Sequence, residues 1–460
     1  MKMESDQEKK IETQSENKFL VKDAFRMAWP AVLESFFVAF VGMVDSMMVS
    51  ALGAYAVAAV GLTVQPKFIG LAVFIAVNMA VSALTARRKG ESNRKSANEI
   101  LATAILFVIL ACVVVSIICV VFASPIIRLV GSEADTHDSA VAYFRIIMGG
   151  IIFTVISLVI NAAQRGSGNT QIAMRTNLVS NIINVIFNYL LIGGHFGFPA
   201  WGVEGAAIAT VLGSMVACGM SIHSLFGKDS FVQIQFWLAE KIRTSWVSGK
   251  QIFKFAYNVF IEQLLVRVGF LTVTMMTAKL GTNAFAVHQV GMNVMGLSFA
   301  FGDGMQVAAV SLIGQSLGRD KPELARKYGS ICQRMGTVIS IVLSLLYLVG
   351  GRWFFGLYFQ EQELIALGVQ IMRLMVFIVL LQIAQVIYMG CLRGAGDVRF
   401  TTIASMLGVT IVRPLSSWIF AYGIGMGIIG IWIGVICDQI VRFSLTAWRF
   451  KSGKWAKVKI

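Results

Sequence analysis

The sequence is poor in charge, and this shortage excludes most classes of soluble protein. Of the 460 residues, 14% are charged, whereas a soluble domain carries about 25%. Hydrophobic residues make up 57% of the chain. About twelve segments of roughly 20 apolar residues would use about 240 residues, which leaves chain for short loops but not for a large soluble domain. The composition therefore predicts a polytopic membrane protein.

The sequence also lacks the motifs of several kinds of enzyme. It contains neither a GxxxxGK[ST] phosphate loop nor an HExxH motif, and its six cysteines show no CxxC spacing. One GxSxG string, at 314–318, follows a predicted helix where a hydrolase needs a strand. Most of the 39 basic residues lie between apolar runs, and they form no nucleic-acid face. We expect no enzyme, no cofactor and no nucleic-acid partner.

Twelve apolar runs are long enough to cross a bilayer. Because backbone polar groups in lipid must be satisfied within a segment, each run is predicted to be an α-helix. This predicts an all-α membrane protein with twelve spans. The runs cover residues 28–50, 57–83, 98–122, 141–163, 176–193, 203–226, 255–278, 284–313, 330–350, 366–390, 401–421 and 427–448.

The connections between these runs alternate in charge, and the alternation predicts the topology. Basic residues cluster in one set of connections and in both terminal segments, while the opposite set contains few of them. The positive-inside rule places the basic set and both termini in the cytoplasm. The first 20 residues are polar and show no cleavable signal peptide. The basic connections contain Arg87–Lys89, Arg165 and Arg175, 228–250, 319–327, and Arg393 and Arg399.

The chain repeats itself with a constant offset of 228 residues. Six spans per half is an even number, so both halves share one orientation. Parallel repeats of this kind are related by a pseudo-twofold axis along the membrane normal, with the substrate path between them. The predicted parts are a tail at 1–24, an N-lobe at 25–226, a linker at 227–252, a C-lobe at 253–448 and a basic tail at 449–460. The matched pairs include Glu34 with Glu262, Gly53 with Gly281, Arg145 with Arg373, and Arg165 with Arg393.

Two carboxylates in the first span form the first candidate site. Glu34 and Asp45 are 11 residues apart, about 20° from a whole number of helical turns, so they share a face about 16 Å apart along the axis. Ionisable side chains inside spans usually face a cavity or a charged partner. The pair is therefore a candidate proton or cation ladder, or else a structural pair with Lys67 in the second span. Pro30 removes a helix hydrogen bond and is a candidate hinge.

A stripe of carboxamides follows the fifth span. Asn177, Asn181, Asn184 and Asn188 are spaced by four, three and four residues, which places them on one helix face. Each amide offers a donor and an acceptor, which suits a protonated carboxyl, a sodium ion or water. The alternative is a structural role in holding helices together. Asn184 and Asn188 are the candidates for function.

The second half contains further polar residues inside its spans. Glu262 stands at the repeat position of Glu34, and Arg267 nearby could neutralise it. Gln289, Asp303 and Gln382 are additional candidates in the eighth and tenth spans.

These features resemble the multidrug and toxic compound extrusion (MATE) transporters. The resemblance covers about residues 20–455, and the ordered set of motifs together with the repeat is more specific than any single motif. The motifs are Pro30 with MVDSMMVSALGAYAVAAVGL around Asp45, NIINVIFNYLLIGG, GVEGAAIAT, GQSLGR, CLRGAGD and WIGVICDQIVRF.

The resemblance implies a V-shaped antiporter that exports organic, often cationic, drugs in exchange for H⁺ or Na⁺. By motif, Asp45 resembles the ion-coupling aspartate of the N-lobe, and Asn184, Asn188 and Thr210 resemble its polar neighbours. Glu262 resembles the C-lobe carboxylate of NorM-like members. A sodium ion could then bind at Asp45, Asn184 and Asn188 or at Glu262. The resemblance also implies a monomer in the bilayer of a bacterial inner membrane.

Two positions depart from the family pattern and leave the coupling ion open. Asn188 stands where DinF-like, proton-coupled members often have aspartate, and Gln382 stands where NorM-like members have a cation-binding aspartate. An alternative function is a flippase for a lipid-linked precursor, which would need cationic residues along the cavity. Arg267, Lys67 and Arg413 lie inside spans and keep that alternative open. A membrane enzyme or an uncoupled channel is the third class considered.

Overall fold

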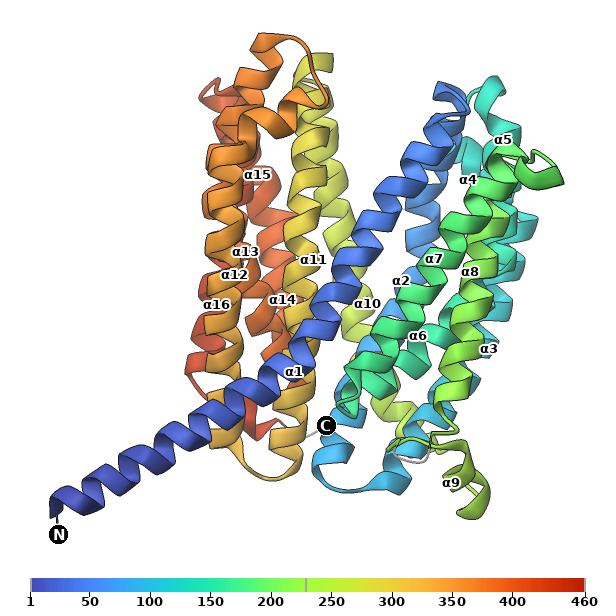
Figure 1. Cartoon of the computed structure of the whole chain (residues 1–460). Helices are drawn as coiled ribbons and strands as arrows, with labels where there is room; N and C mark the ends of the chain where they lie inside the picture. The colour runs from blue at the N-terminus through green and yellow to red at the C-terminus, as the bar shows by residue number, and fades with distance from the viewer. Residues whose placement is uncertain (1, 228–229, 459–460) are drawn as a thin grey trace. The chain divides into compact units, whose positions relative to one another are not determined.

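The chain folds into helices, as the sequence predicts. A computed structural model describes residues 2–227 and 230–458, and no strand occurs in those ranges (Figure 1). The main helices are α1 (Lys2–Ser50), α2 (Ala54–Gly90), α3 (Arg94–Val121), α4 (Ala123–Leu129), α5 (Ala134–Gly149), α6 (Ile151–Gly166), α7 (Thr170–Gly193), α8 (Gly202–Ser224), α9 (Ile234–Ala239), α10 (Trp246–Ala278), α11 (Thr282–Gly318), α12 (Pro322–Gly356), α13 (Gln362–Gly394), α14 (Val398–Ser405), α15 (Arg413–Trp418) and α16 (Gly427–Lys451).

The helices account for the predicted number of membrane spans. Among the described residues, eleven helices are long and apolar enough to cross a membrane, and a bent pair brings the number to twelve. The span Val398–Gly423 contains α14 and α15 with π-helical turns after each of them. The prediction of an all-α polytopic protein with twelve spans is therefore confirmed.

The fourth predicted span needs a correction. The run at 141–163 was expected to be one helix, but α5 and α6 meet at a bend of 45°. The bend falls at Gly149 and Gly150, and such glycine pairs are common sites of sharp kinks. A Cβ at Gly150 would lie 2.6 Å from methyl carbons of Val211, so glycine also permits this close packing.

The predicted linker range of 227–252 contains helical structure. It contains the short helix α9, and α10 already begins at Trp246 instead of near residue 255. Arg94 and Asn98 near the start of α3 hold the linker by hydrogen bonds to the Phe231 carbonyl (3.0 and 3.3 Å). The indole of Trp237 in α9 donates to Asn98 at 2.6 Å.

The chain divides into two compact units. The N-terminal unit comprises residues 34–264, and the C-terminal unit comprises residues 1–33 and 265–460. Both boundaries fall inside long helices, α1 and α10. Leu20 and Ala24 of α1 are buried in the large apolar core of the C-terminal unit. The lobe limits predicted from sequence, 25–226 and 253–448, stay a prediction.

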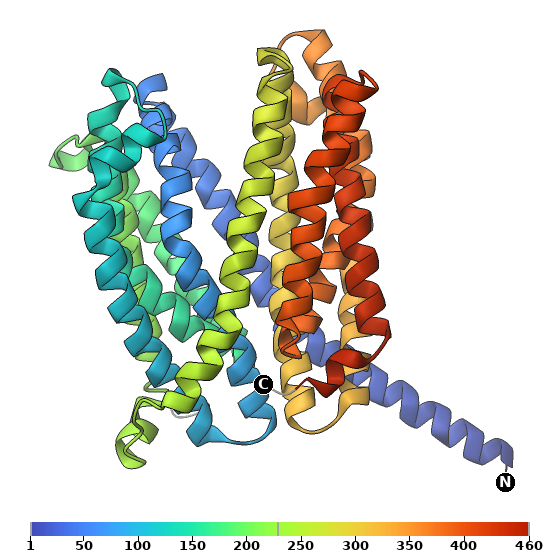
Figure 2. The same ribbon diagram turned by 180° about the vertical axis from the view of Figure 1, so that it is seen from behind.

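Within each unit the long helices stand side by side (Figures 1 and 2). In the N-terminal unit α2 packs against α3, α5 and α6, and α7 packs against α8. In the C-terminal unit α13 packs against α11, α12 and α16.

The internal repeat is visible in the structure. The helices α2 and α11 both have 37 residues, and their first and last residues differ by 228. Gly53 and Gly281, just before them, have φ angles of 110° and 105°, which suit glycine alone. A Cβ at Gly166 would lie 2.4 Å from the Ser82 carbonyl oxygen, and one at Gly394 would lie 2.5 Å from that of Val310. These two close helix contacts obey the same offset.

Candidate functional site

Three helices of the N-terminal unit bring polar side chains together around Asp45. Asp45 lies near the end of α1, Asn184 and Asn188 lie one turn apart on α7, and Thr210 lies on α8. The site forms because α7 and α8 pack along each other. The i, i+4 spacing of the two asparagines places both side chains on the same face of α7, where both contact Asp45. The structure thus assembles four residues that the sequence analysis grouped.

Neutral amides supply the hydrogen bonds to the Asp45 carboxylate. Asn188 Nδ2 donates to Asp45 Oδ1 at 2.7 Å. In the orientation that satisfies both ends of its amide, Asn184 donates from Nδ2 to Oδ1 and Oδ2 of Asp45 at 2.8 and 3.0 Å. Its oxygen then accepts from the backbone N and from Oγ1 of Thr210, both at 3.2 Å. Asp45 is therefore held by donors that carry no net charge.

The Asp45 site combines a reachable carboxylate with buried supports. Asp45 is partly exposed, while Asn188 is 1% exposed and Asn184 is 6% exposed. Lys67, considered from sequence as a partner, forms no salt bridge with Asp45 in the described part of the chain, and its amine lies 6.0 Å from the ring centroid of Phe68. Asp45 can therefore exchange an ion without first breaking a short salt bridge to Lys67.

Glu34 has a different environment from Asp45. Its Oε1 accepts from Arg165 Nη1 at 2.8 Å and from Asn177 Nδ2 at 2.6 Å. The side chains of Glu34 and Arg165 are each 10% exposed. The structural partner of Glu34 is thus Arg165 at the end of α6, not Lys67. Its predicted role in ion uptake stays a prediction, and the fixed positive partner is unfavourable to it.

The second-half candidates are divided between the two units. Glu262 is buried at 3% exposure and belongs to the N-terminal unit. Gln289 and Asp303 lie on exposed positions of α11, and Gln382 is fully buried in α13. Their functional roles stay predictions. Pro30 lies inside α1, four residues before the boundary between the two units, a position consistent with a hinge.

The sequence analysis missed a buried ion cluster in the C-terminal unit. Asp438 on α16 binds Arg413 Nε at 3.0 Å and Arg442 Nε at 2.7 Å. Asp438 is fully buried and Arg413 is 1% exposed. The i, i+4 spacing of Asp438 and Arg442 was a signal that could have revealed half of this cluster, whereas Arg413 comes from another helix.

A transition-metal centre finds no support in the described residues. They contain no group of three or more His, Cys, Asp or Glu side chains placed to hold a metal ion. The Asp45 site offers carboxylate and amide oxygens, which are ligands for hard cations such as Na⁺ and suit a proton equally well.

Comparison with known proteins shows similarity over nearly the whole chain. Residues 30–190 and 259–419 match the family model described as MatE. A probable multidrug resistance protein NorM from Thermotoga maritima is 27% identical, with 95% of this chain and 93% of that protein covered. An uncharacterized transporter, YisQ, from Bacillus subtilis is 25% identical, with 94% of each chain covered.

Solved structures show the same fold. A multidrug resistance MATE family transporter of the MOP superfamily in an outward-facing conformation aligns with a TM-score of 0.87 and 21% identity, covering 95% of this chain and 97% of that chain. A MOP superfamily transporter from Pyrococcus furiosus, described as having a binding pocket of reverse polarity that suggests a different function, aligns with a TM-score of 0.86 and the same identity and coverage.

Proposed function

The chain belongs to the MatE family, and from that premise we propose that it is a secondary active multidrug efflux antiporter. It exports organic, often cationic, compounds in exchange for H⁺ or Na⁺ by alternating access. The observation that carries the proposal is the Asp45 site, where a partly exposed carboxylate in a membrane helix is held by neutral amides. Ionisable residues at such depth mark ion or substrate pathways.

Coupling follows from the charge of Asp45. An ionised Asp45 carries a negative charge that its amide partners do not neutralise, and this carboxylate attracts an organic cation. Uptake of H⁺ or Na⁺ cancels that charge, so a bound organic cation loses its counter-charge and is released. The ion and the drug then compete for one carboxylate, which is the requirement for antiport.

The Asn184 amide suits both states of this carboxylate. An ionised Asp45 accepts hydrogen bonds from the amide nitrogen, as the geometry above describes. A protonated Asp45 has a hydroxyl that needs an acceptor, and a half-turn of the amide presents its oxygen in the same place. Thr210 Oγ1 can donate to or accept from the other end of the amide. Proton uptake therefore needs only a local rotation, and the two amide oxygens can equally contribute to a sodium site.

The remaining roles follow from position. The segment of α1 that bends when the lobes alternate is the part around Pro30. The boundary between the two units, at Leu33 and Glu34, lies directly after it. Glu262 and Gln382 would contribute to substrate or ion binding in the second half. The protein would work as a monomer in a bacterial inner membrane with both termini in the cytoplasm.

One of the three basic residues that supported the flippase alternative is already paired with a carboxylate. A lipid-linked pyrophosphate would need basic side chains free to face it, but Arg413 is buried against Asp438. Export of organic compounds therefore remains the better-supported function.

The test is ion movement driven by a drug gradient in proteoliposomes. An ethidium gradient across the membrane should drive counter-flow of H⁺, read by an internal pH dye, or of Na⁺, read by a sodium dye. The ion that moves identifies the coupling ion. Ethidium transport without movement of either ion would exclude antiport, and transbilayer movement of a lipid-linked pyrophosphate without ethidium transport would favour the flippase.

A further inference from the structure

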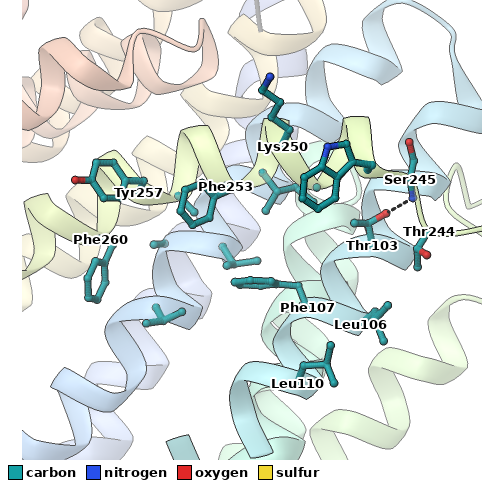
Figure 3. Close-up of a pocket in the computed structure, with 17 residues that line it drawn as sticks. Thr103, Leu106, Phe107, Leu110, Thr244, Ser245, Lys250, Phe253, Tyr257 and Phe260 are labelled. Carbon is teal, nitrogen blue, oxygen red and sulfur yellow. Dashed lines mark hydrogen bonds between the residues drawn. The ribbon is translucent and has the colours of Figure 1, made fainter. Parts of the chain in front are cut away.

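A large apolar pocket lies within the N-terminal unit, away from Asp45. It has a volume of about 910 Å³ and is lined by residues 73–77 of α2, 103–110 of α3 and 244–260 of the linker and α10. Figure 3 shows Phe253 of α10 facing Phe107 and Leu110 of α3. A concave, mostly apolar space of this size is large enough to hold a small amphipathic ligand.

The pocket opens to the outside of the unit. Phe253 is 62% exposed and Leu110 is 60% exposed, although both line the pocket. In a membrane-spanning helix, apolar side chains that are exposed in this way face lipid. The pocket is therefore a lateral groove that is reached from the bilayer.

One end of the groove contains residues that suit contact with a polar headgroup. Lys250 lies at this end, with its amine directed away from the apolar side chains (Figure 3). Trp246, 87% exposed at the start of α10, has the position of an interfacial tryptophan. The backbone N–H of Ser245 donates to Thr103 Oγ1 at 3.1 Å, which fixes the linker against α3 at this end.

The part of the groove from Lys250 onward matches one leaflet in length. From Lys250 to Phe260, ten residues of helix span about 15 Å, which is half of the roughly 30 Å hydrocarbon core. Lys250 lies on the side of the basic connections, which the positive-inside rule assigns to the cytoplasm. An acyl chain lying along the groove from Lys250 would therefore end near the middle of the bilayer.

The charge of the groove selects among amphipathic ligands. None of the 17 residues that line it is acidic, and Lys250 is the charged residue among them. An organic cation would meet a positive charge with no carboxylate to balance it, whereas an anionic phosphate would meet a partner. We propose that this lateral groove binds an anionic phospholipid of the leaflet on the basic side, with its headgroup at Lys250 and an acyl chain between α3 and α10.

The chain offers matched variants for a test. Lys250→Ala removes the headgroup contact. Lys254→Ala makes the same charge change one turn later on α10, at an exposed residue outside the pocket lining. Gly249→Phe keeps the charge and fills the groove. A Cβ at Gly249 meets Thr103 Cγ2 at an ordinary 3.6 Å, so the backbone there accepts a side chain.

The experiment uses the full chain in nanodiscs of equal parts phosphatidylglycerol and phosphatidylcholine with the same acyl chains. Lipid retained by the protein after gentle detergent extraction is counted by native mass spectrometry. The wild type should retain phosphatidylglycerol in preference. Lys250→Ala should lower that preference about fivefold, Lys254→Ala should leave it unchanged, and Gly249→Phe should reduce retention of both lipids.

Three results would overturn the proposal. The first is retention of both lipids in their bulk ratio by the wild type. The second is an equal loss of preference in Lys250→Ala and Lys254→Ala, which would show a general effect of surface charge. The third is competitive displacement of the retained phosphatidylglycerol from the wild type by tetraphenylphosphonium, which would show a groove for organic cations. If Gly249→Phe does not fold, the comparison of Lys250→Ala with Lys254→Ala still tests the proposal.

Discussion

The two repeated halves differ in kind at the position of Asp45. In the N-terminal unit, Asp45 lies among Asn184, Asn188 and Thr210. The residue that follows it by the repeat offset of 228 is Val273, 3% exposed in an apolar cluster with Ala421 and Ile431. The same fold thus supports a polar site in one half and ordinary hydrophobic packing in the other. The helix arrangement therefore does not require the carboxylate, and its presence calls for a functional explanation.

A second contrast concerns two aspartates inside spans. Asp438 is buried between Arg413 and Arg442, so its charge is balanced permanently. Asp45 is bound by neutral amides and has no short ion pair among the described residues, so its carboxylate stays available to an incoming ion. The first arrangement serves structure and the second serves exchange. The following predictions test that distinction.

The largest effect is expected for Asp438→Asn. The change leaves two arginines buried without their counter-charge, and breaking a buried ion pair in this way costs about 3–5 kcal/mol. The free energy of unfolding in mixed detergent micelles measures it. Glu363→Gln, at an exposed position of the same unit, is the control and should change little. A loss below about 1 kcal/mol would show that the triad is not a structural element.

An intermediate effect is expected for Glu34→Gln. The change removes the charge of Glu34 from its mostly buried hydrogen bond with Arg165. A hydrogen bond to a charged group contributes about 1.5–3 kcal/mol to the free energy of unfolding. Glu91→Gln is the matched control, because Glu91 binds Arg88 at 2.6 Å but is 30% exposed, and surface pairs contribute about 0–1 kcal/mol. Equal losses of unfolding free energy in the two variants would refute the importance of burial here. Ethidium efflux that persists in Glu34→Gln would assign Glu34 to structure.

The smallest effect is expected for Asn188→Ala. It removes one hydrogen bond to Asp45, and a loss of about 1 kcal/mol corresponds to a roughly fivefold slower ethidium efflux. Asn181→Ala lies on the same face of α7, two turns nearer its start, and should leave efflux unchanged. Equal rates in the two variants would remove Asn188 from the site.

Much of the fold could be predicted because membrane spans are local features of the sequence. Apolar runs of about 20 residues specify helices by themselves. Helix periodicity also predicted that Asn184 and Asn188 share a face, whereas the family resemblance was needed to group them with Asp45. The bend between α5 and α6 was not predicted, because a run of apolar residues has the same composition whether the helix is straight or kinked at Gly150.

The partners of charged residues could not be predicted in the same way. Arg165 is 131 residues from Glu34, and Arg413 is 25 residues from Asp438. These pairings depend on which helices pack together, and a single sequence carries no periodicity that reports such packing. Lys67 was a reasonable candidate partner by composition, but its amine lies beside Phe68 instead.

Ethidium efflux and unfolding of Asp45→Asn, measured on one preparation, test the central claim most directly. Asparagine can accept and donate hydrogen bonds with the surrounding amides, so the unfolding free energy should change by less than about 1 kcal/mol. It cannot take up a proton or balance a cation as a carboxylate does, so ethidium transport by the reconstituted protein should fall to the level of liposomes without the protein. Unimpaired efflux by a folded Asp45→Asn protein would contradict the account.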